Sequence, residues 1–67
     1  MSPYKTAVQV PVERLRHLIG AGGATIRGIM ERTHTRLHVN DDGRIEIEAA
    51  DSATAEAAAQ EVRRLTA

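Results

Sequence analysis

The chain has 67 residues, which is enough for one small domain but not for a catalytic domain joined to a substrate domain. Hydrophobic residues make up 42% of it, but many are alanines, so we expect a thin core and modest stability. The absence of cysteine excludes disulfides, cysteine-containing zinc sites and thiol catalysis. No apolar run is long enough to cross a membrane and no secretory signal is visible at the N-terminus, so we expect a cytoplasmic chain without a membrane partner.

The charges balance overall, with nine basic and nine acidic side chains, but they are unevenly distributed. Residues 1–40 hold six basic and two acidic side chains, whereas residues 41–67 hold three basic and seven acidic ones. Eight of the nine cations are arginines, whose planar guanidinium groups suit phosphates and base edges. The first half of the chain is therefore the part expected to face an anion, although any single charge is more simply a solvated surface group.

A short strand and two short helices are predicted in the first half. Residues 6–10 alternate small or polar side chains with valine and stop at Pro11, which is typical of a strand. Residues 1–5 are predicted to form a flexible extension. Residues 12–19 carry apolar side chains at helical spacing, and a second helix with its own apolar stripe is predicted after Gly23.

A hairpin and a long helix are predicted in the second half. Residues 35–39 and 44–49 alternate in polarity, and Asp41-Asp42-Gly43 between them is typical of a three-residue hairpin loop with glycine in the left-handed conformation. If Asn40 pairs with Arg44, every facing pair is compatible: Val39 with Ile45, Leu37 with Ile47, His38 with Glu46 and Arg36 with Glu48. The last segment begins with the cap candidates Asp51 and Ser52 and carries an alanine-rich stripe at helical spacing.

The order strand, helix, helix, strand, strand, helix predicts a single α+β domain over residues 1–67. Three helices are expected to cover one face of a three-stranded antiparallel sheet.

Residues 20–23, the glycine loop, join the two short helices and contain three glycines. Glycine permits positive φ and close approach of a ligand, and the helix that follows presents unpaired N–H groups, so the loop suits a phosphate. A Walker loop is excluded because no lysine follows the last glycine and a helix precedes it, and the dinucleotide-binding spacing is absent. On these residues alone, a hinge that only lets two helices cross is the alternative.

The segment Leu18-Ile19-Gly20-Ala21-Gly22-Gly23-Ala24-Thr25-Ile26 resembles the Ile-Gly-x-x-Gly-x-x-Ile signature of the KH family of single-stranded nucleic-acid binders. The resemblance covers residues 8–66 and includes the βααββα order of the type I KH fold. It is strongest to the KH domain of bacterial polynucleotide phosphorylase, which has a similar short Asp-Asp-Gly hairpin. The resemblance implies a non-catalytic module, usually part of a larger multidomain chain, that grips about four nucleotides of RNA or, less selectively, single-stranded DNA.

The resemblance also implies a groove between the two glycine-linked helices and the strand at residues 35–40, which is a sheet edge in the family. The glycine loop would grip the sugar-phosphate backbone, aliphatic side chains would form a floor for the bases, and cations would surround it. The implied binding residues are Arg16, His17, Ile19, Gly20, Ala21, Gly22, Gly23, Ala24, Ile26, Arg27, Arg36, Leu37 and His38. The spacing of the three aliphatic members, Ile19, Ile26 and Leu37, is equally compatible with a role in the core.

Two positions depart from the family pattern. Ala21 stands where relatives often have a basic residue, which removes a phosphate contact, and His34 stands where many have glycine, so a positive φ is expected there. The single aromatic residue, Tyr4, lies outside the motif, so bases have no aromatic platform and we expect micromolar or weaker binding with a small salt dependence.

Enzymatic, metal and cofactor sites are not expected. His34 and His38 are four residues apart on a predicted strand, too far apart to share a metal ion, and no nucleophile motif surrounds either serine. From another functional class, the alternative is a structural module that self-associates through its alanine-rich helix or an exposed edge strand, with weak or no nucleic-acid binding.

Overall fold

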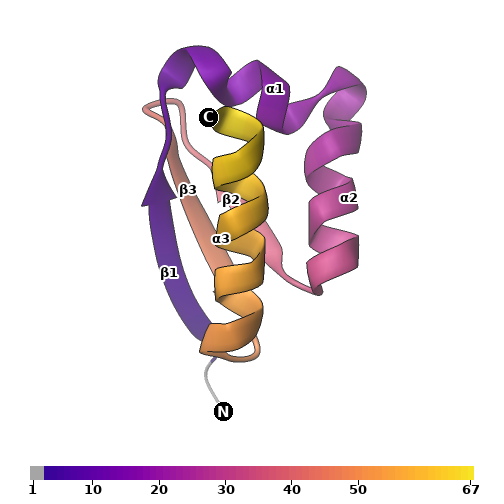
Figure 1. The fold of residues 1–67 in the computed structure, drawn as a ribbon, viewed down its shortest axis with the longest axis vertical. Helices are drawn as coiled ribbons and strands as arrows, with labels where there is room; N and C mark the ends of the chain where they lie inside the picture. The colour runs from indigo at the N-terminus through magenta and orange to yellow at the C-terminus, as the bar shows by residue number, and fades with distance from the viewer. Residues whose placement is uncertain (1–2) are drawn as a thin grey trace.

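The computed structural model describes residues 3–67 and shows a three-stranded sheet with helices on one face (Figure 1). The elements in chain order are β1 (Tyr4–Gln9), the 3₁₀ turn η1 (Val12–Arg14), α1 (Leu15–Ile19), the 3₁₀ turn η2 (Ala21–Gly23), α2 (Ala24–Thr33), β2 (Arg36–Val39), β3 (Arg44–Ala49) and α3 (Ser52–Thr66). The predicted βααββα order is confirmed. Within residues 3–67 no helix combines the length and the apolar character needed to cross a membrane.

The sheet has the order β1-β3-β2, with both pairs antiparallel. All four facing pairs predicted for the hairpin are observed: Arg36 with Glu48, Leu37 with Ile47, His38 with Glu46 and Val39 with Ile45. The Asn40 amide donates to the Arg44 carbonyl at 2.9 Å, and Gly43 has a φ of 92°. The three-residue loop is therefore confirmed as well.

β1 begins two residues earlier than the alternation predicted. Tyr4 pairs with Ala49 and Lys5 with Glu48, and the Lys5 ammonium lies 3.8 Å from the Glu48 carboxylate. The flexible extension predicted for residues 1–5 therefore does not include these two residues, and residues 1–2 lie outside the described part of the chain.

The predicted first helix is divided. Its first turn is η1, and Arg14 adopts φ −96° and ψ −5° before α1 begins. As a result Val12 does not join the apolar face of the helix and remains 53% exposed.

The core lies between the sheet and the helices. Its largest fully buried side chains are Leu18, Ile29, Ile45, Ile47 and Val62. The buried alanines of α3, which are Ala55, Ala58 and Ala59, let this helix lie close to the sheet. The core thus combines larger aliphatic side chains from the sheet, α1 and α2 with the alanines of α3, and through it α1 and α2 pack against α3.

His34 ends α2 in the left-handed conformation, with φ 53° and ψ 45°. The Thr35 amide donates to the Met30 carbonyl at 3.1 Å, which is the long hydrogen bond of a Schellman motif. This bond turns the chain directly from α2 into β2. The positive φ expected at His34 is confirmed.

Candidate nucleic-acid interface

The glycine loop connects α1 to α2 through three residues with positive φ. Gly20 has φ 76° and ψ 176°, Gly22 has φ 62° and ψ 19°, and Gly23 has φ 78° and ψ 13°. A side chain at Gly20 is also excluded by space, because a Cβ atom there would lie 2.2 Å from Thr25 Oγ1. By contrast, nothing lies within 4 Å of the corresponding positions at Gly22 and Gly23. The loop is thus anchored at its first glycine and open at the other two.

Two loop amides face away from the protein. The Gly23 amide donates to the Gly20 carbonyl at 3.2 Å, and the Ala24 amide donates to the Ala21 carbonyl. The C=O and N–H of a trans peptide unit point in opposite directions. The amides of Ala21 and Gly22, which share peptide units with those two carbonyls, therefore point away from them, and within residues 3–67 no acceptor is recorded for either. They lie at the N-terminus of α2, where the helix dipole favours an anion.

Arg27, one turn into α2, reaches back to the loop. Its Nη2 atom donates to the Gly22 carbonyl at 3.1 Å. The sequence predicted only a cationic contact to a ligand at this position, and it missed both this hydrogen bond and the packing of Thr25 against Gly20. The sequence did offer one indication of the hydrogen bond. Arg27 follows Gly22 by five residues, a spacing at which a side chain in the first turns of a helix reaches the preceding loop.

The aliphatic residues assigned to a groove floor are mostly part of the core. Ile26 and Leu37 are each 9% exposed, and both belong to the main hydrophobic cluster. Ile19 is half-buried. Any apolar trough beside the glycine loop is therefore shallow.

β2 lies at one edge of the sheet, as the resemblance implied. Hydrogen-bonded and non-hydrogen-bonded pairs alternate along antiparallel strands. Since Asn40 bonds Arg44, the alternation assigns His38 and Arg36 to the bonded pairs and turns the N–H and C=O groups of Leu37 and Val39 toward the free edge. A ligand lying along β2 would meet these four backbone groups.

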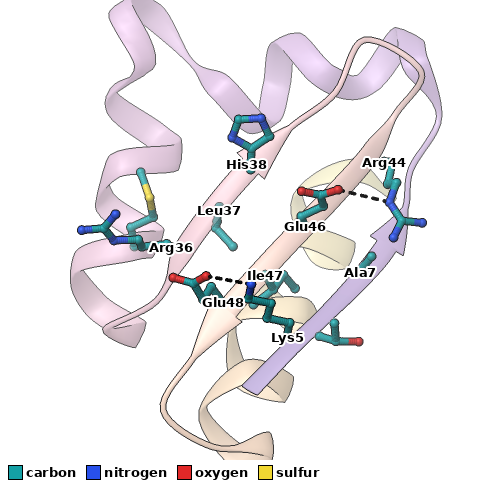
Figure 2. Close-up of a pocket in the computed structure, with 11 residues that line it drawn as sticks. Lys5, Ala7, Arg36, Leu37, His38, Arg44, Glu46, Ile47 and Glu48 are labelled. Carbon is teal, nitrogen blue, oxygen red and sulfur yellow. Dashed lines mark ion pairs between the residues drawn. The ribbon is translucent and has the colours of Figure 1, made fainter. Parts of the chain in front are cut away.

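Arg36 and His38 project from β2. They alternate with the buried Leu37, so they lie on the open face of the sheet, with Arg36 on the side of α2 (Figure 2). There they line a shallow depression of about 820 Å³ together with Lys5, Ala7, Arg44, Glu46 and Glu48. Carboxylates share this face, and Arg44 lies 3.6 Å from Glu46. The face therefore has mixed charge.

The remaining predicted cations lie on the loop side of the molecule. Arg16 and His17 are exposed in the last turn of α1, directly before the glycine loop. The predicted site residues thus fall into two places: Arg16, His17, residues 19–24 and Arg27 lie on the glycine loop and its flanking helices, whereas Arg36 and His38 lie on β2. Within residues 3–67, no group of three or more His, Cys, Asp or Glu side chains is placed to hold a metal ion.

Comparison with known proteins agrees with this geometry. A model of the KH domain family matches residues 5–64. The chain belongs to the KH domain family. Similar curated proteins include the polyribonucleotide nucleotidyltransferases of Syntrophotalea carbinolica, 42% identical over 69 residues, and Hyphomonas neptunium, 35% identical over 66 residues. Each alignment covers 98% of this chain but only 10% and 9% of those proteins, so the KH chain spans about a tenth of their length.

Solved structures share the fold, among them a KH type I domain. The first KH type I domain of human vigilin aligns with a TM-score of 0.84 at 21% identity, covering 98% of this chain and 73% of that one. A chain in the crystal structure of the a/eIF2alpha-aDim2p-rRNA complex from Pyrococcus horikoshii OT3 aligns with a TM-score of 0.88 at 25% identity, covering 96% of this chain and 39% of that one. The type I fold predicted from the order of elements is therefore confirmed.

Proposed function

We propose that this KH domain binds single-stranded RNA, and less selectively single-stranded DNA, without catalysis, by gripping about four nucleotides. The observation that carries the proposal is the pair of outward-facing amides at Ala21 and Gly22, at the start of α2. A phosphate would accept from these amides, while the free backbone groups of Leu37 and Val39 would meet base edges. The catalytic activity named for the longer relatives is not proposed for this chain.

The same structure argues for weak binding. Ala21 supplies no cation at the tip of the loop, and Ile26 and Leu37 offer little exposed apolar surface. Affinity would rest on backbone hydrogen bonds and a few phosphate contacts, so we expect micromolar or weaker binding with a shallow salt dependence.

The test is a titration with a labelled strand of about four to eight nucleotides, followed by amide chemical shifts. We expect shifts at residues 16–27 and 35–39. The double variant Ala21→Asp/Gly22→Asp places two carboxylates at the phosphate grip and should abolish binding while leaving the circular dichroism spectrum unchanged. Aspartate tolerates the positive φ at residue 22, and the space there is open.

A matched control carries the same two charges elsewhere. Ala53 and Ala57 are exposed on α3, so Ala53→Asp/Ala57→Asp changes the net charge equally without touching the glycine loop. This control should retain binding. Equal loss of affinity in both double variants, or shifts confined to other parts of the chain, would contradict the proposed site.

Self-association stays a prediction of its own. Both β1 and β2 are edges of the sheet, and an unpaired edge is a template for a second strand. Sedimentation across a range of concentrations tests it, and a monomer at high concentration would rule it out.

A further inference from the structure

The Gly22–Gly23 peptide unit differs from its neighbours in the glycine loop. Its N–H points inward and donates to the Gly20 carbonyl, so its C=O points the opposite way. The carbonyls of Gly20 and Ala21 are occupied by backbone amides, whereas the Gly22 carbonyl accepts from the guanidinium of Arg27. One peptide unit is thus held at both ends, by the backbone on one side and by Arg27 on the other.

The orientation of this peptide unit bears on the adjacent pair of amides at Ala21 and Gly22. Gly22 and Gly23 have no Cβ atom to restrict their backbone, and a Cβ at either position would meet nothing within 4 Å. Rotation would release the Gly23 amide from the Gly20 carbonyl and would disturb the neighbouring unit, which carries the outward Gly22 amide. A rotated carbonyl would also bring a partial negative charge toward a bound phosphate.

We propose that Arg27 is a positioning residue, which fixes the Gly22–Gly23 peptide unit and thereby keeps the Ala21 and Gly22 amides directed at a phosphate. The role rests on the proposed function, but the fixing of the loop is a property of the free protein. Arginine suits this role because its planar group reaches the carbonyl with a defined geometry. Lysine has one rotating ammonium group and would hold the carbonyl less firmly.

The experiment compares Arg27→Gln and Arg27→Lys with the unchanged protein. Solvent-exchange NMR of the Gly23 amide, measured without ligand, reports whether the peptide unit is fixed. We expect exchange about two- to tenfold faster in Arg27→Gln, the range for a hydrogen bond of ordinary strength, and a smaller increase in Arg27→Lys. Arg63→Gln is the matched control, because Arg63 is exposed on α3 and bonds Glu56 rather than the loop. It should leave the Gly23 amide unchanged.

Binding to the labelled strand then separates positioning from direct contact. For Arg27→Gln we expect a similar two- to tenfold loss of affinity with an unchanged slope of log K against log salt. If the slope of log K against log salt in Arg27→Gln is less steep by about 0.7, Arg27 itself neutralises a phosphate. That result would overturn the positioning role. Unchanged exchange of the Gly23 amide would overturn it too. If the unchanged protein binds no strand, the proposed function fails, and the exchange data alone decide whether Arg27 fixes the loop.

Discussion

At the scale of single residues, Gly20 and Gly22 are required for different reasons. Gly20 combines φ 76° with ψ 176°, a region that is almost restricted to glycine, and it lies against Thr25. Gly22 has a left-handed backbone but open space around it. The first glycine is thus needed for the fold itself, whereas the second leaves room for a ligand.

This difference predicts unequal effects of the same substitution. Gly20→Ala should lower the free energy of unfolding by about 3 kcal/mol, since it adds a steric clash to backbone strain. Gly22→Ala should cost only about 1 kcal/mol, because it places alanine in the left-handed region without a clash. Urea denaturation of both variants measures the difference, and equal losses would show that Thr25 does not constrain Gly20.

The sequence predicted a loop whose glycines take positive φ, which is observed, but it did not predict the contacts around that loop. Residues 20–23 could be identified as such a loop because three glycines in four residues indicate a backbone that needs positive φ or close approach. The hydrogen bond of Arg27 was missed because a side-chain rotamer is not encoded in spacing. Arg36 was grouped with the loop although its alternation with Leu37 already placed it on the opposite face of the strand.

At the scale of elements, α3 has a defined start. The Thr54 amide donates to Asp51 Oδ1 at 2.8 Å, and this hydrogen bond lowers the pKa of the Asp51 carboxyl below its ordinary value. Of the two cap candidates predicted from the sequence, Asp51 is confirmed, and Ser52 is the first residue of the helix. On the same helix, Glu61 accepts from Arg64 and lies 3.5 Å from Arg32 of α2, so it links the two helices.

The lowered pKa of Asp51 gives a pH-dependent contribution to stability. The folded state stabilises the ionised form of the carboxyl group relative to the unfolded chain, in which its pKa is about 3.9. The contribution is thus fully present above about pH 4 and is lost as the pH falls through the lower folded value. Asp51→Asn keeps a capping oxygen but does not titrate. The free energy of unfolding of the unchanged protein, relative to that of Asp51→Asn, should decrease as the pH is lowered from about 4. A difference between the two proteins that stays constant with pH would contradict this.

The hairpin could be predicted residue by residue, whereas β1 could not. In β2 and β3 apolar and charged side chains alternate on both strands, and only one register satisfies every pair. Tyr4 and Lys5 show no such alternation, and they join β1 through pairing with Ala49 and Glu48, which are distant in sequence. Long-range pairing of this kind leaves no local pattern.

At the scale of the whole molecule, stability depends on a few fully buried branched side chains. A chain of this length is expected to have a free energy of unfolding of roughly 3–10 kcal/mol. Ile45 is central, since it is fully buried on β3 and faces Val8 on one side and Val39 on the other.

Truncation at this position should therefore be costly. Ile45→Val should lower the free energy of unfolding by about 1 kcal/mol and Ile45→Ala by about 3 kcal/mol. Urea midpoints with an unchanged slope measure both values. Val12→Ala is the control, because Val12 is 53% exposed, and it should change stability by no more than about 0.5 kcal/mol. A similar effect of Val12→Ala would mean that the core does not dominate stability.

The two ends of the described chain lie at opposite ends of the long axis of the molecule (Figure 1). β1 begins at the end of the molecule where α3 also begins, whereas the C-terminus lies beside α1, which leads into the glycine loop. A domain fused after the C-terminus would start beside α1, the helix that leads into the glycine loop. A domain fused before β1 would start at the opposite end of the molecule, so fusion order would decide how near a second module lies to the loop.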